Sequence, residues 1–69
     1  MKYIELRGRI VEKFGTIGNF CKAVEISRAM MSLKLNGHAP FTQQQIADWS
    51  KLLDIPMKDI GKFFFNSKL

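Results

Sequence analysis

Apolar residues recur along this chain with the period of an α-helix. The first apolar stripe falls on residues 4–14 and consists of Leu6, Ile10, Phe14 and the neighbouring Val11. Its spacing predicts a helix over these residues with one buried face. Gly15 follows at the position that glycine favours just beyond a helix end. Gly8 lowers helix propensity by about 1 kcal/mol relative to alanine, and we interpret it as a place where another element packs closely.

Residues 16–37 contain two shorter stripes of the same kind. The apolar pairs, each four residues apart, are Phe20 with Val24 and Met31 with Leu35. Thr16 and Ser27 each precede a stripe, where a hydroxyl group can accept a hydrogen bond from the first turn of a helix. Asn36 and Gly37 tolerate a positive φ and suit the end of the second helix. The stretch therefore predicts two short helices joined by a tight turn.

The last third of the chain predicts two more helices. Thr42 and Gln45 have the spacing of a capping box, in which each side chain bonds the other residue's backbone N–H. The buried stripe that follows consists of Ile46, Trp49 and Leu53, with Leu52 at its margin. Pro56 suits the first turn of a final helix. The inner face of that helix consists of Ile60, Phe63 and Phe64.

These patterns predict an all-α fold of five short helices around one core, as a single domain over residues 1–69. A chain of this length buries only about 60% of its unfolded surface, so its stability margin is thin. Cys21 is the only cysteine, which excludes an internal disulfide and indicates the reducing cytoplasm. The apolar runs are too short to span a bilayer, and residues 1–5 lack the layout of a signal peptide, so no membrane partner is expected.

The charge of the chain favours an anionic partner. Eleven lysine and arginine residues against six aspartate and glutamate residues give a formal net charge of +5. Nucleic acid is the usual partner of a small basic domain. The alternative interpretation is that the charge only keeps the domain in solution.

Two runs of sequence resemble a known family. The run ISRAMMSLKLNGHAPF, residues 26–41, is similar to the recognition helix and following loop of the Cro and repressor group of phage helix-turn-helix proteins, and LRGRIVEKFG precedes it. The similarity extends over residues 6–64, in particular to small Cro-like regulators of phages and prophages of Gram-positive bacteria. It implies a five-helix, lambda-repressor-like DNA-binding domain with residues 28–35 as the recognition helix.

The resemblance implies which side chains touch double-stranded DNA. In the family the recognition helix lies in the major groove, and the positions that face base edges here are Arg28, Ala29, Ser32 and Leu33. The guanidinium fork of Arg28 matches the O6 and N7 acceptors of guanine, with a phosphate contact as the alternative. Ser32 can donate or accept and is less selective. Contacts to the DNA backbone fall to helix starts and loops, at Thr16, Asn19, Ser27, Asn36, His38, Thr42 and Gln43.

Three residues depart from the family pattern. Ile17 stands where many relatives have a glutamine that braces the recognition helix, so that brace must be missing or replaced. Glu25 stands where the turn usually has glycine, and a positive φ there costs about 1 kcal/mol. Leu33 replaces a position that is commonly polar, and with Ala29 it suits thymine methyl groups. The operator sequence therefore cannot be borrowed from a relative.

Two functions compete. The first is a transcriptional regulator that binds a roughly palindromic operator as a dimer, which pairs weakly or only on DNA. The candidates for the dimer contact are three adjacent rings, Phe63, Phe64 and Phe65, and the alternative is that all three pack in the core. The second function is an antirepressor that binds a phage repressor through the apolar Met30 and Leu33.

The remaining reactive residues indicate structural roles. The chain has no nucleophile–base pair, metal-ligand spacing or phosphate-binding glycine loop, so we expect no enzyme activity, metal or cofactor. His38 is the only histidine and has no second ligand near it in the sequence. We expect Cys21 to fill a small core site. Lys34 is expected to lie beside the apolar face with its ammonium group turned outward.

Overall fold

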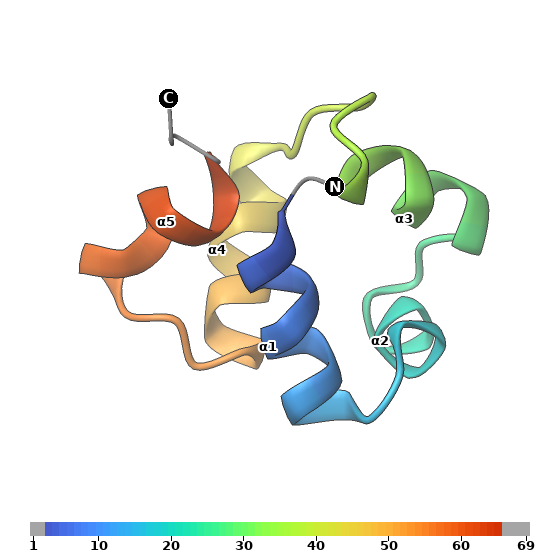
Figure 1. The fold of residues 1–69 in the computed structure, drawn as a ribbon, viewed down its shortest axis with the longest axis horizontal. Coiled ribbons are helices and arrows are strands. Elements are labelled where there is room, and N and C mark those ends of the chain that lie inside the picture. The colour runs from blue at the N-terminus through green and yellow to red at the C-terminus, as the bar shows by residue number, and fades with distance from the viewer. Residues whose placement is uncertain (1–2, 66–69) are drawn as a thin grey trace.

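Five α-helices and one short 3₁₀-helix make up residues 3–65, the part of the chain that the computed structural model describes (Figure 1). Their bounds are α1 Ile4–Phe14, α2 Ile17–Val24, α3 Arg28–Leu35, α4 Gln43–Leu52, η1 Met57–Asp59 and α5 Ile60–Phe64. α2 and α3 lie on one side of α1 and α4, and α5 lies on the other. The predicted all-helical class is confirmed for this part of the chain, which contains no strand. None of its helices has the length and apolar character needed to cross a membrane.

The core is centred on the indole ring of Trp49 in α4. Its centroid lies 5.0 Å from the ring of Phe20 in α2 and 5.4 Å from that of Phe41 in the loop before α4. Phe41 also contacts Phe64 in α5 at 5.5 Å and Tyr3 at 5.2 Å, again edge to face. Aromatic pairs in this geometry stabilise a fold beyond the area that they bury. One cluster of rings thus connects α2, α4, α5 and the loop.

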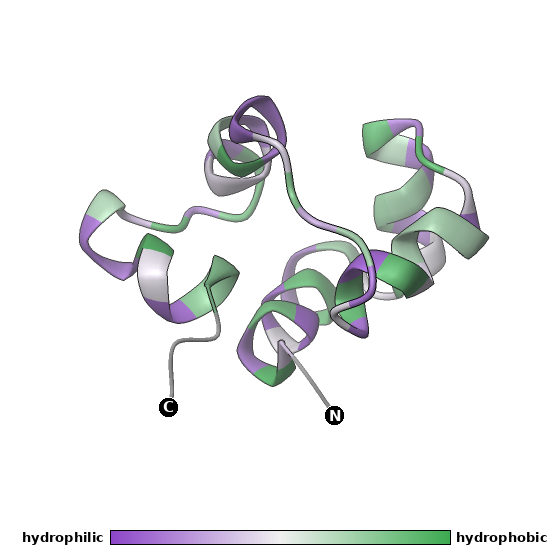
Figure 2. Cartoon of the chain, turned by 90° about the horizontal axis from the view of Figure 1, so that it is seen from above, coloured by the Kyte–Doolittle hydropathy of each residue, from purple (hydrophilic) through white to green (hydrophobic). Residues whose placement is uncertain are grey.

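Each of the five α-helices carries both hydrophobic and hydrophilic residues (Figure 2), and each contributes buried apolar side chains to the core. The buried side chains include the predicted Leu6, Ile10, Met31 and Leu35. Val11 differs from the expectation because it lies at the edge of the α1 stripe and is exposed. The interpretation of Gly8 is also wrong, since a Cβ atom placed there meets nothing within 4 Å. No element packs closely against α1 at that position.

The C-terminal end of α4 is held by side chains of α1. Arg9 Nη1 donates to the carbonyl oxygens of Leu53 at 2.7 Å and Asp54 at 2.9 Å. A cation at this place satisfies carbonyl groups that have no partner within the helix. Lys13 reaches the same corner, where its ammonium group bonds the carboxylate of Asp54 at 2.9 Å. This hydrogen bond holds the pKa of Asp54 below its usual range.

The predicted last helix is divided in two. Pro56 precedes the 3₁₀-helix η1, and regular α-helix begins only at Ile60. Phe63 and Phe64 are buried, whereas Phe65 is 60% exposed. The core of the chain covers Phe63 and Phe64, so of the three candidates for a dimer contact only Phe65 remains a candidate.

Replacing Gly8 by alanine should stabilise the domain. The new methyl group meets open space, and we expect Gly8→Ala to raise the free energy of unfolding by about 0.5–1 kcal/mol in urea denaturation. Gly15→Ala is the matched control, because Gly15 has a φ of 88° and the same change there should destabilise the domain. A Gly8→Ala variant no more stable than the parent would contradict this description of α1.

Candidate nucleic-acid interface

α2 and α3 are joined by a three-residue turn in which Glu25 makes the reversal. The backbone of Glu25 is left-handed, with a φ of 59°. The N–H of Ile26 donates to the carbonyl of Cys21 at 3.1 Å, and the N–H of Glu25 donates to that of Lys22 at 3.3 Å. This pair of bonds is a Schellman motif. It satisfies the last carbonyl groups of α2 and sets the direction in which α3 leaves the turn.

Hydroxyl caps begin α2, α3 and α4, as predicted. Thr16 Oγ1 and Ser27 Oγ each accept from the third amide of their helix, at 3.0 and 3.1 Å. Thr42 and Gln45 form the predicted capping box through two bonds of 3.0 Å. The first two amides of a helix that is capped in this way have no partner within the helix and carry partial positive charge. Three such helix starts therefore lie around the turn and the loop.

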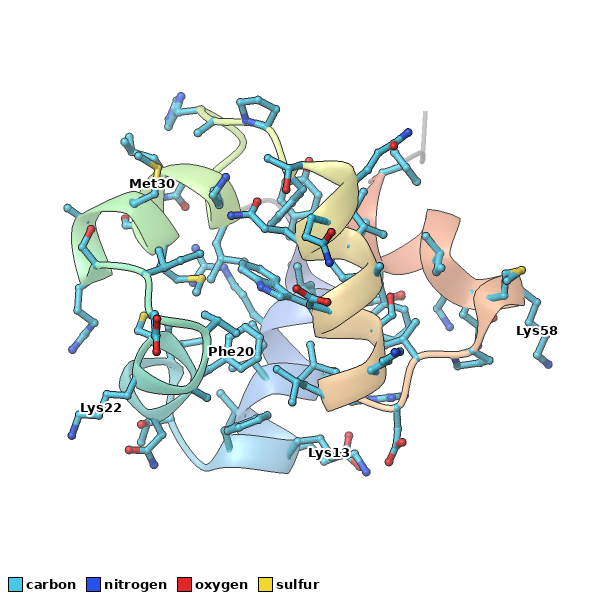
Figure 3. All side chains as sticks on the ribbon, turned by 180° about the vertical axis from the view of Figure 1, so that it is seen from behind. Lys13, Phe20, Lys22, Met30 and Lys58 are labelled. Atoms are coloured by element: carbon cyan, nitrogen blue, oxygen red, sulfur yellow. The ribbon has the colours of Figure 1, made fainter. Side chains whose placement is uncertain are left out.

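α3 has one buried face and one exposed face. Its buried residues are Met31, Lys34 and Leu35. The four candidate base-reading residues all lie on the exposed face, at Arg28, Ala29, Ser32 and Leu33. Met30 is exposed beside them, and its side chain points away from the interior that Phe20 occupies (Figure 3). The outer side of α3 is therefore free of contacts that would bury it within residues 3–65.

Lys34 ties the end of α3 to the following loop. Its side chain is buried, with 6% exposure, and Nζ donates to the carbonyl oxygen of Pro40 at 2.6 Å. The same ammonium group lies 5.8 Å from the centroid of the Phe41 ring. The expectation that it turns outward is wrong, because the carbonyl oxygen and the ring face replace part of its hydration. The positive charge of Lys34 is therefore structural.

Arg28 connects the start of α3 to the start of α2. A Cβ atom placed on Gly18 would lie 3.3 Å from Nη1 of Arg28 and 3.8 Å from its Cζ. The absence of a side chain at Gly18 thus leaves room for the guanidinium group. Ile17 lines the same hollow as Arg28. The guanidinium group of Arg28 therefore lies beside the first turn of α2.

A second connection joins α1 to the other end of α3. Arg7 Nη2 donates to Asn36 Oδ1 at 2.9 Å, and Asn36 Nδ2 donates to Ser32 Oγ at 3.2 Å. The sequence places Asn36 among the DNA-backbone candidates, and in the structure its amide serves this connection. Arg7 is missing from the residues that the sequence singles out. The two residues are 29 positions apart in the chain, and no local pattern signals their contact.

The remaining candidates for DNA-backbone contacts lie at three places. Thr16 and Asn19 are on the first turn of α2, where Asn19 Nδ2 donates to the carbonyl oxygen of Phe14 at 2.8 Å. Asn19 is therefore partly used in joining α2 to α1. His38 is exposed in the loop after α3, and Gln43 is exposed on the first turn of α4.

Acidic residues are nearly absent from the stretch that contains α2, α3 and the first half of α4. Glu25 is the only one between Lys13 and Ala47. Lys22 and Arg28 are exposed within this stretch, and Lys22 extends outward from α2 (Figure 3). A surface with this imbalance attracts anions. This signal is visible in the sequence and identifies the same side of the molecule as α3.

The side chains that could bind a metal ion do not cluster within residues 3–65. Among the described residues, no three of His, Cys, Asp and Glu come together in a way that could hold a metal ion. Cys21 is buried in the core, as predicted. What the geometry offers is a surface, which consists of the exposed face of α3 and the capped helix starts around it.

A family model matches nearly the whole chain. The family is described as "Protein of unknown function (DUF739)", and the match covers residues 1–67. The chain belongs to this family. No curated protein matches the chain.

Replacing Glu25 by glycine should relieve strain in the turn. A residue with a Cβ atom is destabilised in the left-handed region by about 1–2 kcal/mol, whereas glycine is not. Glu25→Ala is the matched control, because it removes the same charge and keeps the Cβ atom. We expect Glu25→Gly to exceed Glu25→Ala by about 1 kcal/mol in the free energy of unfolding, measured by urea denaturation. Equal stability of the two variants would show that the φ of 59° is not strained here.

Proposed function

We propose that this chain is a sequence-specific DNA-binding regulator that places α3 in the major groove of an operator. The observation that carries the proposal is the exposed outer face of α3, in a stretch with a single acidic residue between Lys13 and Ala47. The major groove is about 12 Å wide and admits an α-helix. The succession of α2, turn and α3 is that expected of a helix-turn-helix.

Arg28 supplies the most selective contact in this proposal. Its guanidinium group is a fork of donors that matches the two acceptors of guanine, and such a pair discriminates by about 1–3 kcal/mol. The guanidinium group lies beside Gly18 on the first turn of α2. Ala29 and Leu33 offer only carbon, which suits the methyl group of thymine.

The helix starts position the domain on the duplex in this proposal. Thr16 and Thr42 each satisfy one amide, and the amides before it remain available to phosphate oxygens. Gln43 and His38 are exposed and can donate to the same backbone. Contacts of this kind supply affinity and register but carry no sequence information.

A dimer of this domain is expected to use Phe65. Its ring is exposed, and Ile4 of the adjacent α1 is exposed as well. A contact this small suits subunits that pair weakly and are brought together by the DNA. Two copies would then read half-sites one helical turn apart, about 34–36 Å, on a roughly palindromic operator.

One observation favours a second candidate function. Met30 and Leu33 are 40% and 44% exposed on α3, and adjacent exposed apolar side chains suit a protein partner. An antirepressor that covers the DNA-binding surface of a phage repressor would use these two residues. The two functions use the same helix and differ in the partner that covers it.

Footprinting on the DNA that flanks the protein's own gene tests the proposal. We expect protection of two symmetric half-sites. We also expect the affinity to fall about a hundredfold between 50 and 200 mM salt if four phosphates are neutralised. An absence of protection, together with tight and salt-insensitive binding to a repressor encoded nearby, would contradict operator binding and favour the antirepressor.

Replacing Arg28 separates base reading from phosphate contact. We expect Arg28→Ala to relax the preference at one base pair by about 1–3 kcal/mol, measured by competition between single-base operator variants. Lys58→Ala is the matched control, because it removes the same charge on the side of the molecule opposite Met30 (Figure 3). An equal loss of affinity for every sequence in Arg28→Ala would make Arg28 a phosphate contact only.

A further inference from the structure

We infer that Arg7 binds a phosphate of the DNA backbone beside the C-terminal end of α3. The inference rests on the proposed function and deepens it by adding a residue of α1 to the surface that meets the duplex. Two observations carry it: no carboxylate within residues 3–65 neutralises Arg7, and Arg7 lines a hollow that it shares with base-reading candidates of α3.

The positive charge of Arg7 is left without a counter-charge in the described part of the chain. The other two cations of α1, Arg9 and Lys13, each pair with a carboxylate, at 3.5 and 2.9 Å. Arg7 instead donates through Nη2 to the side-chain oxygen of Asn36 at 2.9 Å, and an amide carries no net charge. That bond uses one of the five N–H groups of a guanidinium group. Arg7 therefore keeps its charge and further donors for a partner outside the chain.

The guanidinium group of Arg7 is held in place before a partner arrives. Its Nε atom is buried, whereas the bond from Nη2 to Asn36 lies at the exposed surface. A phosphate oxygen therefore meets the Nη end of the group. Because the bond already restricts the side chain, less conformational entropy is lost when a ligand binds. A fork of donors also matches the oxygens of a phosphate in a way that a point charge does not.

Arg7 borders the surface of α3 that is proposed to read bases. The residues that line one hollow with it include Ile17 of α2 and Arg28, Ala29 and Ser32 of α3. No acidic residue of the described chain lines this hollow. Two cations that line one hollow raise its positive potential, which attracts an anion. The hollow opens on the side of the molecule where the proposed function places the duplex.

The position of Arg7 along α3 favours a phosphate over a base. Recognition helices touch base edges with their N-terminal residues, whereas Arg7 bonds Asn36, which follows the last residue of α3. In the proposed complex this end of α3 lies nearer the border of the major groove, where the phosphates are. Arg28, at the N-terminal end, keeps the base contact. A phosphate contact by Arg7 adds affinity for every sequence and no preference among them.

The salt dependence of operator binding measures this contact. Each neutralised phosphate contributes about 0.9 to the slope of log K against log salt concentration. We expect Arg7→Ala to lower the slope by about 0.9, and to weaken binding about 5–10-fold at 100 mM salt for every single-base operator variant. Arg7→Lys keeps the charge and should keep the slope. Fluorescence anisotropy titrations between 50 and 200 mM salt give both quantities.

Asn36→Ala is the matched control, because it removes the bond to Arg7 and leaves the charge. If Arg7 acts only by holding α3 through Asn36, Arg7→Ala and Asn36→Ala weaken binding alike and neither changes the slope. Lys58→Ala removes a charge on the side of the molecule opposite Met30 (Figure 3) and should also leave the slope unchanged. If Arg7→Ala does not fold, Arg7→Gln takes its place, because its amide removes the same charge and can still donate.

Uncharged methylphosphonates identify the phosphate that Arg7 binds. Replacing the phosphates of the operator one at a time removes one negative charge at each position. The parent protein should lose affinity at one position in each half-site where Arg7→Ala loses none, because that variant no longer makes the contact. If Arg7 holds a free anion instead, no position of the duplex shows this difference and the inference is wrong.

Two results would overturn the inference while leaving the proposed function in place. The first is an Arg7→Ala or Arg7→Gln protein with the slope of the parent, while Arg28→Ala still relaxes the preference at one base pair. The second is a phosphate scan in which the parent and the Arg7 variant lose affinity at the same positions. A parent protein that binds no operator overturns the proposed function, and the inference with it.

Discussion

The packing of aromatic rings around Trp49 is the constraint on which the rest of this structure depends. α3 has eight residues, which is too few for a stable helix in water, so its position has to come from its neighbours. Phe20 and Phe41 lie on segments before and after α3, and both contact the same indole ring. This holds α3 at the surface while its Met31 and Leu35 fill the core. The outer face of α3 is exposed because its inner face packs in the core.

Hydrogen bonds from long cationic side chains add to the stability that the small hydrophobic core supplies. Arg9 bonds carbonyl oxygens at the end of α4, Lys34 bonds that of Pro40, and Arg7 bonds the side chain of Asn36. Carbonyl groups at helix ends are the polar groups that an all-helical domain leaves unpaired. Part of the net charge of +5 is therefore structural. Lys22 and Arg28 remain exposed in the stretch around α3, where acidic residues are scarce.

The features that could be predicted from the sequence are local ones. Helix periods and the caps at Thr16 and Ser27 depend on residues within four positions of one another, and the exposed face of α3 follows from the burial of its opposite face. The contact of Arg7 with Asn36 depends on how α1 docks against α3, which no short pattern records. The burial of Lys34 likewise requires a loop carbonyl at the right place. The spacing of the last helix predicts Phe63 and Phe64 on its inner face, and both are buried. The same pattern does not reveal that the helix is preceded by a separate 3₁₀ turn.

The central claim is that the outer face of α3 meets duplex DNA. The most direct measurement is a titration of the isotopically labelled protein with its operator duplex, in which the NMR chemical shifts of the backbone amides are recorded. The account predicts that the largest changes occur at residues 28–33 and at the first turns of α2 and α4, and that α5 changes little except at a dimer contact near Phe65. Shifts confined to α1 and α5, with the amides of Arg28 and Ser32 unmoved, would contradict it.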